Sequence, residues 1–275
     1  MAISVLSNPQ SVNAQRNLSK TQSMLSQSIG RLSSGQRINS AADDAAGLAI
    51  SERMKANMRS LQQASRNAQD GISASQIADG AMDQAGGLLT RMRELAMQSA
   101  NGTLGTSDRT ALNSEFQASL NEIVRIGAVT KFNGTSLLDG TFSASLQVGT
   151  GTSANDTITM GISTAFTAAG LGVTGAAVDS AANATTALTS IDAAIDTVSA
   201  ARGSLGAVQN RLNVTVSNLS TAYENTSAAN SRIRDVDFAE ETAAMTRSQI
   251  LSQAGVSILS QANQLPSAAL SLLGR

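Results

Sequence analysis

The side chains that most often carry out catalysis are scarce in this chain of 275 residues. It contains no His and no Cys, so imidazole general bases, thiol nucleophiles and thiolate metal ligands are all missing. Two neighbouring carboxylates, Asp43 and Asp44, could be read as an acid–base pair. Neighbouring residues of a helix point about 100° apart, however, so these two side chains do not face each other. We expect them to cap or hinge a junction between helices. We predict no enzyme activity, no catalytic residue, no metal site and no cofactor.

The overall charge and hydropathy exclude two further classes of protein. Lys and Arg number 19 against 20 Asp and Glu, the basic residues are scattered, and aromatic residues make up 2%. A basic patch and aromatic platforms are missing, so we expect no nucleic acid partner. No stretch reaches the roughly 18 apolar residues of a membrane span, so we expect no membrane insertion. The first residues lack the pattern of a secretory signal, which favours a cytosolic protein or one that leaves the cell without a cleaved signal peptide.

The clearest apolar pattern lies near the C-terminus, where chains usually fray. Apolar residues recur there every seven positions, and a small residue follows each of the first three by four positions. The ladder is Leu251, Ile258, Leu265 and Leu272, and its small companions are Gly255, Ala262 and Ala269. A lone chain would leave this stripe in water. We interpret it as a surface that is buried between subunits, the alternative being an ordinary helix packed within its own subunit.

A second ladder near the N-terminus offers a partner, because Leu18, Leu25 and Leu32 share the seven-residue spacing. The first 42 residues carry basic but no acidic side chains, whereas an acidic cluster follows residue 234. Opposite charges on the two segments favour their association, although exposed pairs contribute only about 0–1 kcal/mol each. We therefore predict that an N-terminal arm (residues 1–42) pairs with a C-terminal arm (residues 235–275), with the two ladders in contact.

Residues 43–140 have the periodicity of rod helices. Apolar residues recur at intervals of three and four from about residue 45 to residue 100. Asn101-Gly102 is a typical helix end. A shorter amphipathic helix follows, with Ser107 as its expected N-cap.

The β region is short. Residues 141–184 are rich in Gly, Thr and Ser, and apolar residues alternate with polar ones over residues 145–148 and 157–162. This alternation predicts a β-hairpin, with a Gly/Ser/Asn loop between its strands. The remainder, residues 163–184, allows no prediction.

Residues 185–234 predict one long rod helix. An apolar ladder recurs by sevens from Ile191 to Ile233 and then meets Glu240 and Arg247, so the stripe ends and the helix should break between residues 235 and 244. The predicted fold class is mainly α. It consists of long antiparallel helices in a coiled-coil-like rod, a small β-hairpin region and paired terminal helical arms.

Three stretches resemble a known family. Residues 33–50 read SSGQRINSAADDAAGLAI, residues 91–101 read RMRELAMQSAN, and residues 231–273 run from SRI through QANQLP to a final LL. They are similar to the N-terminal signature, the following motif and the C-terminus of bacterial flagellins. The resemblance covers about residues 1–140 and 185–275. The chain resembles a short flagellin that lacks the outer variable domains.

The resemblance implies a structural subunit that self-assembles into the bacterial flagellar filament for swimming motility. It implies export in the unfolded state through the flagellar secretion channel, and an extracellular location in the filament. The paired arms would form the inner core, and the rod helices with the hairpin would form the next shell. The implied partners are further copies of the chain in a homopolymer, a flagellar export chaperone, the filament cap and hook-associated proteins. The alternatives are a hook–filament junction protein, which has related arms, and a membrane-inserting translocator built on amphipathic helices.

The resemblance also implies a surface that is recognised by a vertebrate receptor. Arg91, Leu95 and Glu115 occupy positions that match the family's surface for the innate, Toll-like receptor of flagellin. The same residues could form an ordinary contact between subunits, and the two roles are compatible.

Overall fold

The computed structural model describes the backbone of residues 8–273 and the side chains of residues 8–264. The chain divides into two compact units. The terminal unit takes the described residues of Met1–Ala56 and Asn225–Arg275, and the central unit is Asn57–Glu224. Each unit is described by itself.

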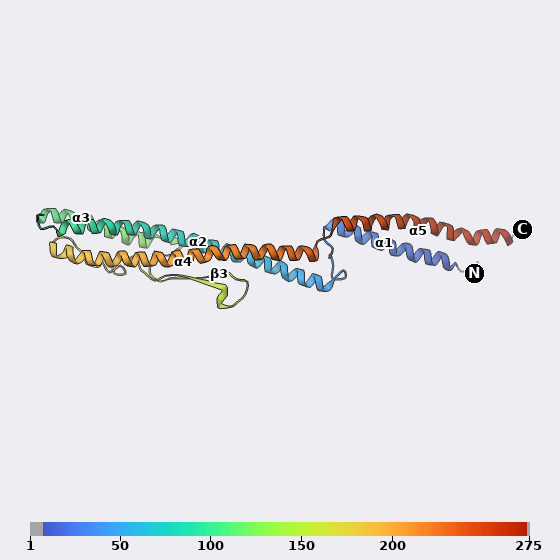
Figure 1. Ribbon diagram of the computed structural model, residues 1–275, viewed down its shortest axis with the longest axis horizontal. Helices are drawn as coiled ribbons and strands as arrows, with labels where there is room; N and C mark the ends of the chain where they lie inside the picture. Colours follow the sequence, from blue (N-terminus) through green and yellow to red (C-terminus); the bar gives the residue numbers. More distant parts are fainter. Residues whose placement is uncertain (1–7, 274–275) are drawn as a thin grey trace. The chain divides into compact units, whose positions relative to one another are not determined.

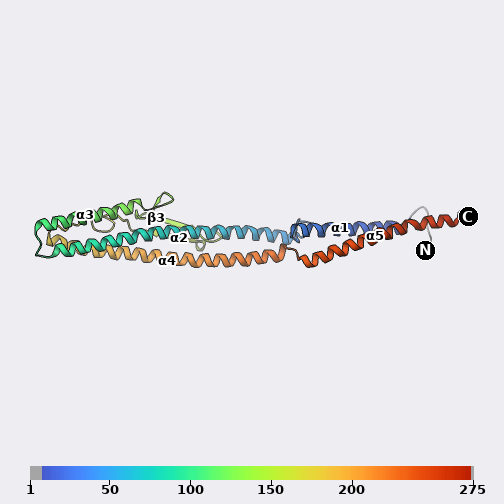
Figure 2. The same cartoon turned by 90° about the horizontal axis from the view of Figure 1, so that it is seen from above.

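The terminal unit is built on two paired helices, α1 (Pro9–Ser34) and α5 (Phe238–Leu273), which lie side by side in Figures 1 and 2. Local sequence sets the ends of α1: the Asn8 side chain accepts a hydrogen bond from the amide of Ser11 at 3.1 Å, and Gly35 ends the helix at φ 70°. The Asn8 side chain also donates to the carbonyl of Ala262 at 2.8 Å. The two helices are therefore antiparallel, which confirms the predicted pairing of terminal helices.

Small and hydroxyl side chains fill the contact between α1 and α5. Thr21 and Ser28 are the buried residues of α1, and Ser248 and Ala262 are buried on α5. At Gly255 the helices are so close that a Cβ atom would lie 3.2 Å from Leu18 Cδ1. Leu18, Leu25 and Leu32 are half-buried beside these positions. We call this contact the seam.

The sequence predicts that the C-terminal ladder packs on the N-terminal one. Among the described residues, Leu251 and Ile258 line a depression with Leu18, at the edge of the contact between the helices. Leu251 and Ile258 remain 48% and 58% exposed, while their small companions Gly255 and Ala262 face α1. Small residues let two helix backbones approach closely, and the bulkier ladder is then turned to the side of the contact. The side chains of Leu265 and Leu272 lie outside the described residues.

The central unit packs the remaining helices around one large apolar core and two smaller apolar clusters. It contains most of α2 (Ala45–Ala100) and α4 (Ala181–Arg234) and all of α3 (Thr106–Val129). Arg202 pairs with Asp79, and Arg93 with Asp192, so α2 and α4 are antiparallel. The largest fully buried side chains of this unit are Phe116, Phe166, Met82, Leu89, Met92, Leu95, Ile123, Leu137, Leu138, Met160 and Ile191. Helix α2 runs without interruption through its five glycines, because this burial outweighs their weak helix propensity.

The ends of these helices agree with the sequence with one exception. Helix α2 ends before Asn101-Gly102 and α4 ends before a break at residues 235–237, both as predicted. Helix α3, however, is capped by Gly105 and not by Ser107. The carboxylate of Asp108 accepts a hydrogen bond from the Gly105 amide at 3.1 Å. The acid in the first turn therefore sets the start of the helix.

The predicted hairpin is present. Strands β3 (Phe142–Gln147) and β4 (Thr157–Ile162) pair antiparallel over six residues each, with Leu146 opposite Ile158. A second, smaller pair consists of β1 (Lys131–Phe132) and β2 (Thr135–Ser136). The turn between β1 and β2 is Asn133-Gly134, with φ 47° and 81°, which is the usual composition of a two-residue hairpin loop.

The segment after β4, for which the sequence allowed no prediction, belongs to the core. Its apolar residues are almost fully buried: Phe166, Leu171, Val173 and Val178. The Asn113 side chain accepts from the amide of Val178 at 2.9 Å, and the Gln117 side chain donates to the carbonyl of Ala176 at 2.7 Å. The apolar residues that anchor this segment in the core have no regular spacing. A search for helical or strand periodicity therefore could not predict that the segment is buried.

Candidate assembly surface

The most prominent candidate for a binding surface is the exposed apolar side of α5. Ile250 is 60% exposed and lies on the same side of the helix as the exposed ladder residues Leu251 and Ile258. Monomeric proteins rarely leave large apolar side chains together in water without a partner. We call Ile250, Leu251 and Ile258 the apolar face.

Two shallow depressions adjoin the apolar face within the terminal unit. One, of about 520 Å³, lies along α5 between Thr242 and Leu251 and is lined almost entirely by apolar atoms. The other, of about 190 Å³, lies between the helices and has Leu18 on one side and Ile258 on the other. Helix α1 has exposed apolar side chains as well, which are Val12, Met24 and Ile29.

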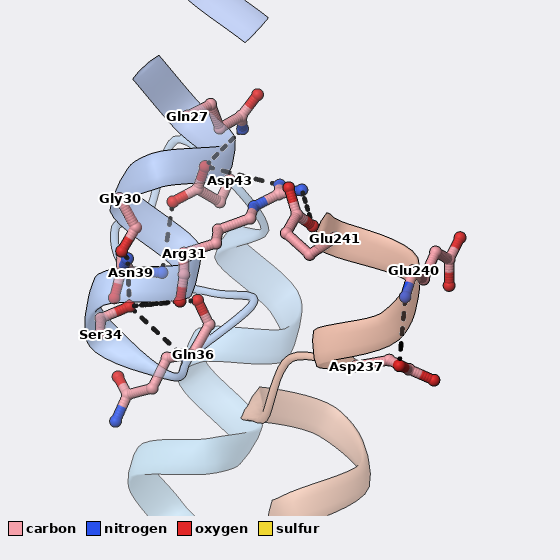
Figure 3. A network of polar contacts seen from close by, with 10 residues as sticks. All are labelled: Gln27, Gly30, Arg31, Ser34, Gln36, Asn39, Asp43, Asp237, Glu240 and Glu241. Carbon is pink, nitrogen blue, oxygen red and sulfur yellow. Dashed lines mark hydrogen bonds and ion pairs between the residues drawn. The ribbon is translucent and has the colours of Figure 1, made fainter. Parts of the chain in front are cut away.

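A network of polar contacts lies where α1 ends and α5 begins (Figure 3). Its residues come from α1, the loop 35–44 and the start of α5: Gln27, Arg31, Ser34, Gln36, Asn39, Asp43 and Glu241. We call this network the polar junction.

Asp43 organises the loop of the polar junction. Its carboxylate accepts hydrogen bonds from the Ser40 amide at 2.9 Å, from the Ser40 hydroxyl at 3.0 Å and from the Gln27 side chain at 3.0 Å. The bond from the Ser40 amide is the main reason that the pKa of Asp43 lies below its ordinary value. The neighbouring Asp44 accepts from the Gly47 amide at 2.8 Å and so caps α2. The two carboxylates therefore have capping and loop-forming contacts, as the sequence suggested.

Arg31 connects the loop to α5. One terminal nitrogen of its guanidinium lies 4.0 Å from the Asp43 carboxylate, and the other lies 3.6 Å from the Glu241 carboxylate. The three side chains are only 12–25% exposed. Arg31 Nε is buried and has no hydrogen-bond partner among the described residues, so the two carboxylates orient the guanidinium.

Backbone contacts join the loop of the polar junction to the end of α4 and the residue that follows it. Gln36 and Asp235 form an antiparallel bridge, and the Arg37 amide donates to the carbonyl of Arg234 at 2.7 Å. Ile38 belongs to the same loop, and its large apolar side chain is buried, with 1% of it exposed.

The side chain of Arg234 joins both halves of the chain here. It donates to Gln36 Oε1 at 2.9 Å and to Glu52 Oε1 at 2.6 Å. The bond from Arg234 is the largest cause of the lowered pKa of Glu52.

The sequence did not single out Arg31, Arg234 or Glu241 as a constellation. The available signal was the opposite charge of the two arms, which predicted attraction but not which side chains meet. Contacts such as Arg37 to Arg234 join residues almost 200 positions apart, and only the fold shows them.

The predicted receptor residues lie in the central unit and differ in exposure. Arg91 is 51% exposed and its guanidinium donates to the Glu115 carboxylate at 2.7 Å, which joins α2 to α3 and raises the pKa of Arg91. Glu94 adds a second contact to the same guanidinium at 2.9 Å. Leu95 is only 1% exposed, so its side chain lies beneath this surface and not on it.

Among the described residues, no group of three or more His, Cys, Asp or Glu side chains is placed to hold a metal ion. No helix over this part of the chain is long and apolar enough to pass through a lipid bilayer. The prominent features are the apolar face, the polar junction and the charged contact between Arg91 and Glu115.

Known proteins are similar in sequence to this chain over nearly its whole length. The family description "Bacterial flagellin N-terminal helical region" matches residues 5–143, and "Bacterial flagellin C-terminal helical region" matches residues 188–273. A flagellin of Halalkalibacterium halodurans is 46% identical over 95% of this chain and 96% of its own length. A flagellar filament 33 kDa core protein of Treponema phagedenis is 41% identical over 94% of this chain and 96% of its own length. The crystal structure of Bacillus cereus flagellin superposes on 60% of this chain and 94% of its own, with a TM-score of 0.50 and 32% identity.

Proposed function

This chain belongs to the bacterial flagellin family and is a structural subunit of the flagellar filament, and we propose that its apolar face on α5 is buried between subunits in that filament. The observation that carries the proposal is the exposure of three large apolar side chains, Ile250, Leu251 and Ile258, on one side of α5. The flagellin matches lend no support to the alternative of a hook–filament junction protein.

The proposal assigns a layer of the filament to each part of the chain. Residues 1–42 and 235–275 form the inner core. Residues 43–140 and 185–234 form the second shell with the region 141–184, which contains the hairpin. The small residues of the seam support this assignment, because a seam that buries little apolar area leaves the arms dependent on neighbouring subunits.

The proposal extends to the route and the partners of the chain. The subunit is exported unfolded through the flagellar channel to the outside of the cell, without a cleaved signal peptide. It meets an export chaperone, the filament cap and hook-associated proteins on the way. The absence of Cys supports this route, because no disulfide has to form or break during passage.

A single charge on the apolar face tests the assembly role. In Ile258→Asp, burial of a carboxylate between subunits would cost several kcal/mol, so seeded growth of filaments should stop. The measurement is sedimentation and electron microscopy of purified protein after the addition of filament seeds.

Gln249→Asp is the matched control, because residue 249 is exposed about 180° around α5 from Ile258 and receives the same charge. We expect this variant to form filaments. Normal filaments from Ile258→Asp would contradict the proposal, provided that both soluble variants keep the helical circular dichroism of the parent.

A second role rests on Arg91 and Glu115, which we propose as part of the surface that the vertebrate innate receptor of flagellin recognises. Their support is exposure and a shared hydrogen bond between α2 and α3. Arg91→Ala should lower the signal of a receptor reporter cell line, whereas Arg93→Ala, which removes a guanidinium that is paired with Asp192, should not. Equal signals from the two variants would reject the assignment.

A further inference from the structure

Contacts between α1 and α5 are distributed unevenly along the seam. We infer that their pairing begins at the polar junction, where Arg31 bridges Asp43 and Glu241, and proceeds from there toward the chain ends. In this scheme Arg31 is a positioning residue: it fixes the first turn of α5 against the last turn of α1. The inference concerns the single chain and does not depend on filament assembly.

Charge favours the polar junction as the starting point. Arg31 lies in the last turn of α1, and Glu240 and Glu241 lie in the first turn of α5. A cation at a helix C-terminus and an anion at a helix N-terminus each interact favourably with the helix dipole. Antiparallel pairing brings these two ends together, so the ion pair between Arg31 and Glu241 is reinforced by both dipoles. Residues 242–275 contain no Asp or Glu, so Arg16 and Lys20 meet no opposite charge on the rest of α5.

Hydrogen bonds from within the loop and from α1 fix the Asp43 carboxylate, one of the two partners of Arg31. Asp43 is fixed by Ser40 and Gln27, which belong to the same half of the chain as Arg31. This carboxylate can therefore orient the Arg31 guanidinium before α5 arrives. The backbone bond from the Val236 amide to the Gly35 carbonyl, at 3.1 Å, then places the start of α5 beside it.

The rest of the seam is too weak to start the pairing. Its buried positions are small or polar, as at Thr21, Ser28 and Ser248. Helices with so little apolar contact are marginal alone. Toward the far end, the Asn8 side chain bonds to the carbonyl of Ala262, and Ser11 and Asn263 share an exposed hydrogen bond. Both are hydrogen bonds between neutral groups, whereas the polar junction joins opposite full charges.

A disulfide placed far from the polar junction can report the pairing. The chain has no Cys of its own, and a Cβ at Gly255 would lie 3.8 Å from Leu18 Cβ, the mean separation in disulfides. The full-length chain with Leu18→Cys and Gly255→Cys is oxidised by glutathione, and the rate of cross-linking is followed by mass spectrometry. Adding Arg31→Ala, or Glu241→Gln, should slow cross-linking roughly three- to tenfold, the effect of losing a half-buried, charge-assisted contact.

Three controls decide between this order of pairing and its alternatives. Arg16→Ala removes the same side chain elsewhere on α1, and Ser11→Ala removes a contact at the far end; both should leave the rate unchanged. Arg31→Lys keeps the charge and should restore part of the rate. The inference is overturned if Arg31→Ala has no effect, or if Arg16→Ala or Ser11→Ala slows cross-linking as much. Amide protection over Leu205 and Leu212, which are buried in the central unit, checks that each variant remains folded there.

Discussion

At Gly127 the backbone of one segment touches the backbone of another. A Cβ atom at this position on α3 would collide with the carbonyl oxygen of Phe166. Backbone cannot rotate away as a side-chain tip can, so the segment after β4 would have to move. A Cβ at Gly80 on α2, in contrast, would meet nothing within 4 Å. The same residue type thus serves close packing in one place and weakens a helix in the other.

These two glycines give a matched pair of substitutions. Gly127→Ala should lower the free energy of unfolding by about 1–3 kcal/mol through overpacking. Gly80→Ala should raise it by up to about 1 kcal/mol, because Ala is the better helix former. Urea unfolding followed by circular dichroism measures both, and a stable Gly127→Ala variant would show that the contact with Phe166 relaxes easily.

Two carboxylates of the terminal unit should make its stability depend on pH. Hydrogen bonds from Ser40 and Arg234 lower the pKa of Asp43 below 3.8 and that of Glu52 below 4.5. A carboxyl group with a lowered pKa in the folded state stabilises that state above its ordinary pKa, and this contribution is lost as the pH falls through the lowered value. We therefore expect the paired arms to loosen below about pH 4.

The cross-linking rate of the chain with Leu18→Cys and Gly255→Cys measures this effect. Each sample is equilibrated at low or at neutral pH and is then treated with a thiol cross-linking reagent that is active at both pH values. Asp43→Asn should reduce the difference between the two pH values, whereas Asp70→Asn in the central unit should preserve it. An equal difference in all three chains would contradict the role of Asp43.

At the scale of elements, the segment between β4 and α4 is a part of the core without regular secondary structure. Phe166 is 0% exposed and its amide donates to the carbonyl of Leu138 at 2.8 Å. Phe166→Ala should cost about 3–5 kcal/mol, as for other buried aromatic residues. The exposed Phe238 is the control, since it is 59% exposed on α5 and its replacement by Ala should change the free energy of unfolding of the central unit little. Thermal unfolding monitored on the central unit by amide exchange distinguishes the two.

Periodic elements could be predicted from the sequence, and irregular ones could not. The long helices and the hairpin repeat a spacing over many residues, so the signal accumulates. Phe166 is held by contacts with Leu138 and with Gly127 of α3, which are distant in sequence, and Arg31 meets Glu241 across 210 positions of sequence, so neither leaves a local pattern. The seam shows a subtler difference: leucines at seven-residue spacing were expected to face α1, but Gly255 and Ala262 do so. Hydrophobicity alone ranks the leucines first, whereas close approach of two helices selects the smaller residues.

At the scale of the molecule, the two units differ in the kind of contact that holds them. The central unit has an extended core with fully buried Met, Leu, Ile and Phe side chains. The buried residues of the terminal unit are Ile38, Thr21, Ser28, Gly47, Ser51, Ser248 and Ala262 among those described. Burial of hydroxyl groups contributes far less to folding than burial of methylene groups. The central unit should therefore be much the more stable of the two.

Amide exchange on the soluble chain tests this difference. Leu205 and Leu212 of α4 should exchange slowly, whereas the outer parts of α1 and α5, such as Ala14 and Gly255, should exchange within seconds. Strong protection throughout residues 8–34 and 245–264 would show that the arms are stable without neighbours, and the dependence of the arms on assembly would then be wrong.

The hydroxyl-rich seam has a further consequence for the response to temperature. The change in heat capacity when surfaces meet is set mainly by the apolar area removed from water, with polar area acting in the opposite sense. A contact lined by Thr21, Ser28, Ser248 and Gly255 removes little of the first and some of the second. The heat capacity change for pairing α1 with α5 should therefore be close to zero, and the enthalpy of pairing nearly constant. The free energy of pairing the two arms would then vary almost linearly with temperature. Cooling would not weaken the pairing in the way that it weakens a contact between large apolar surfaces.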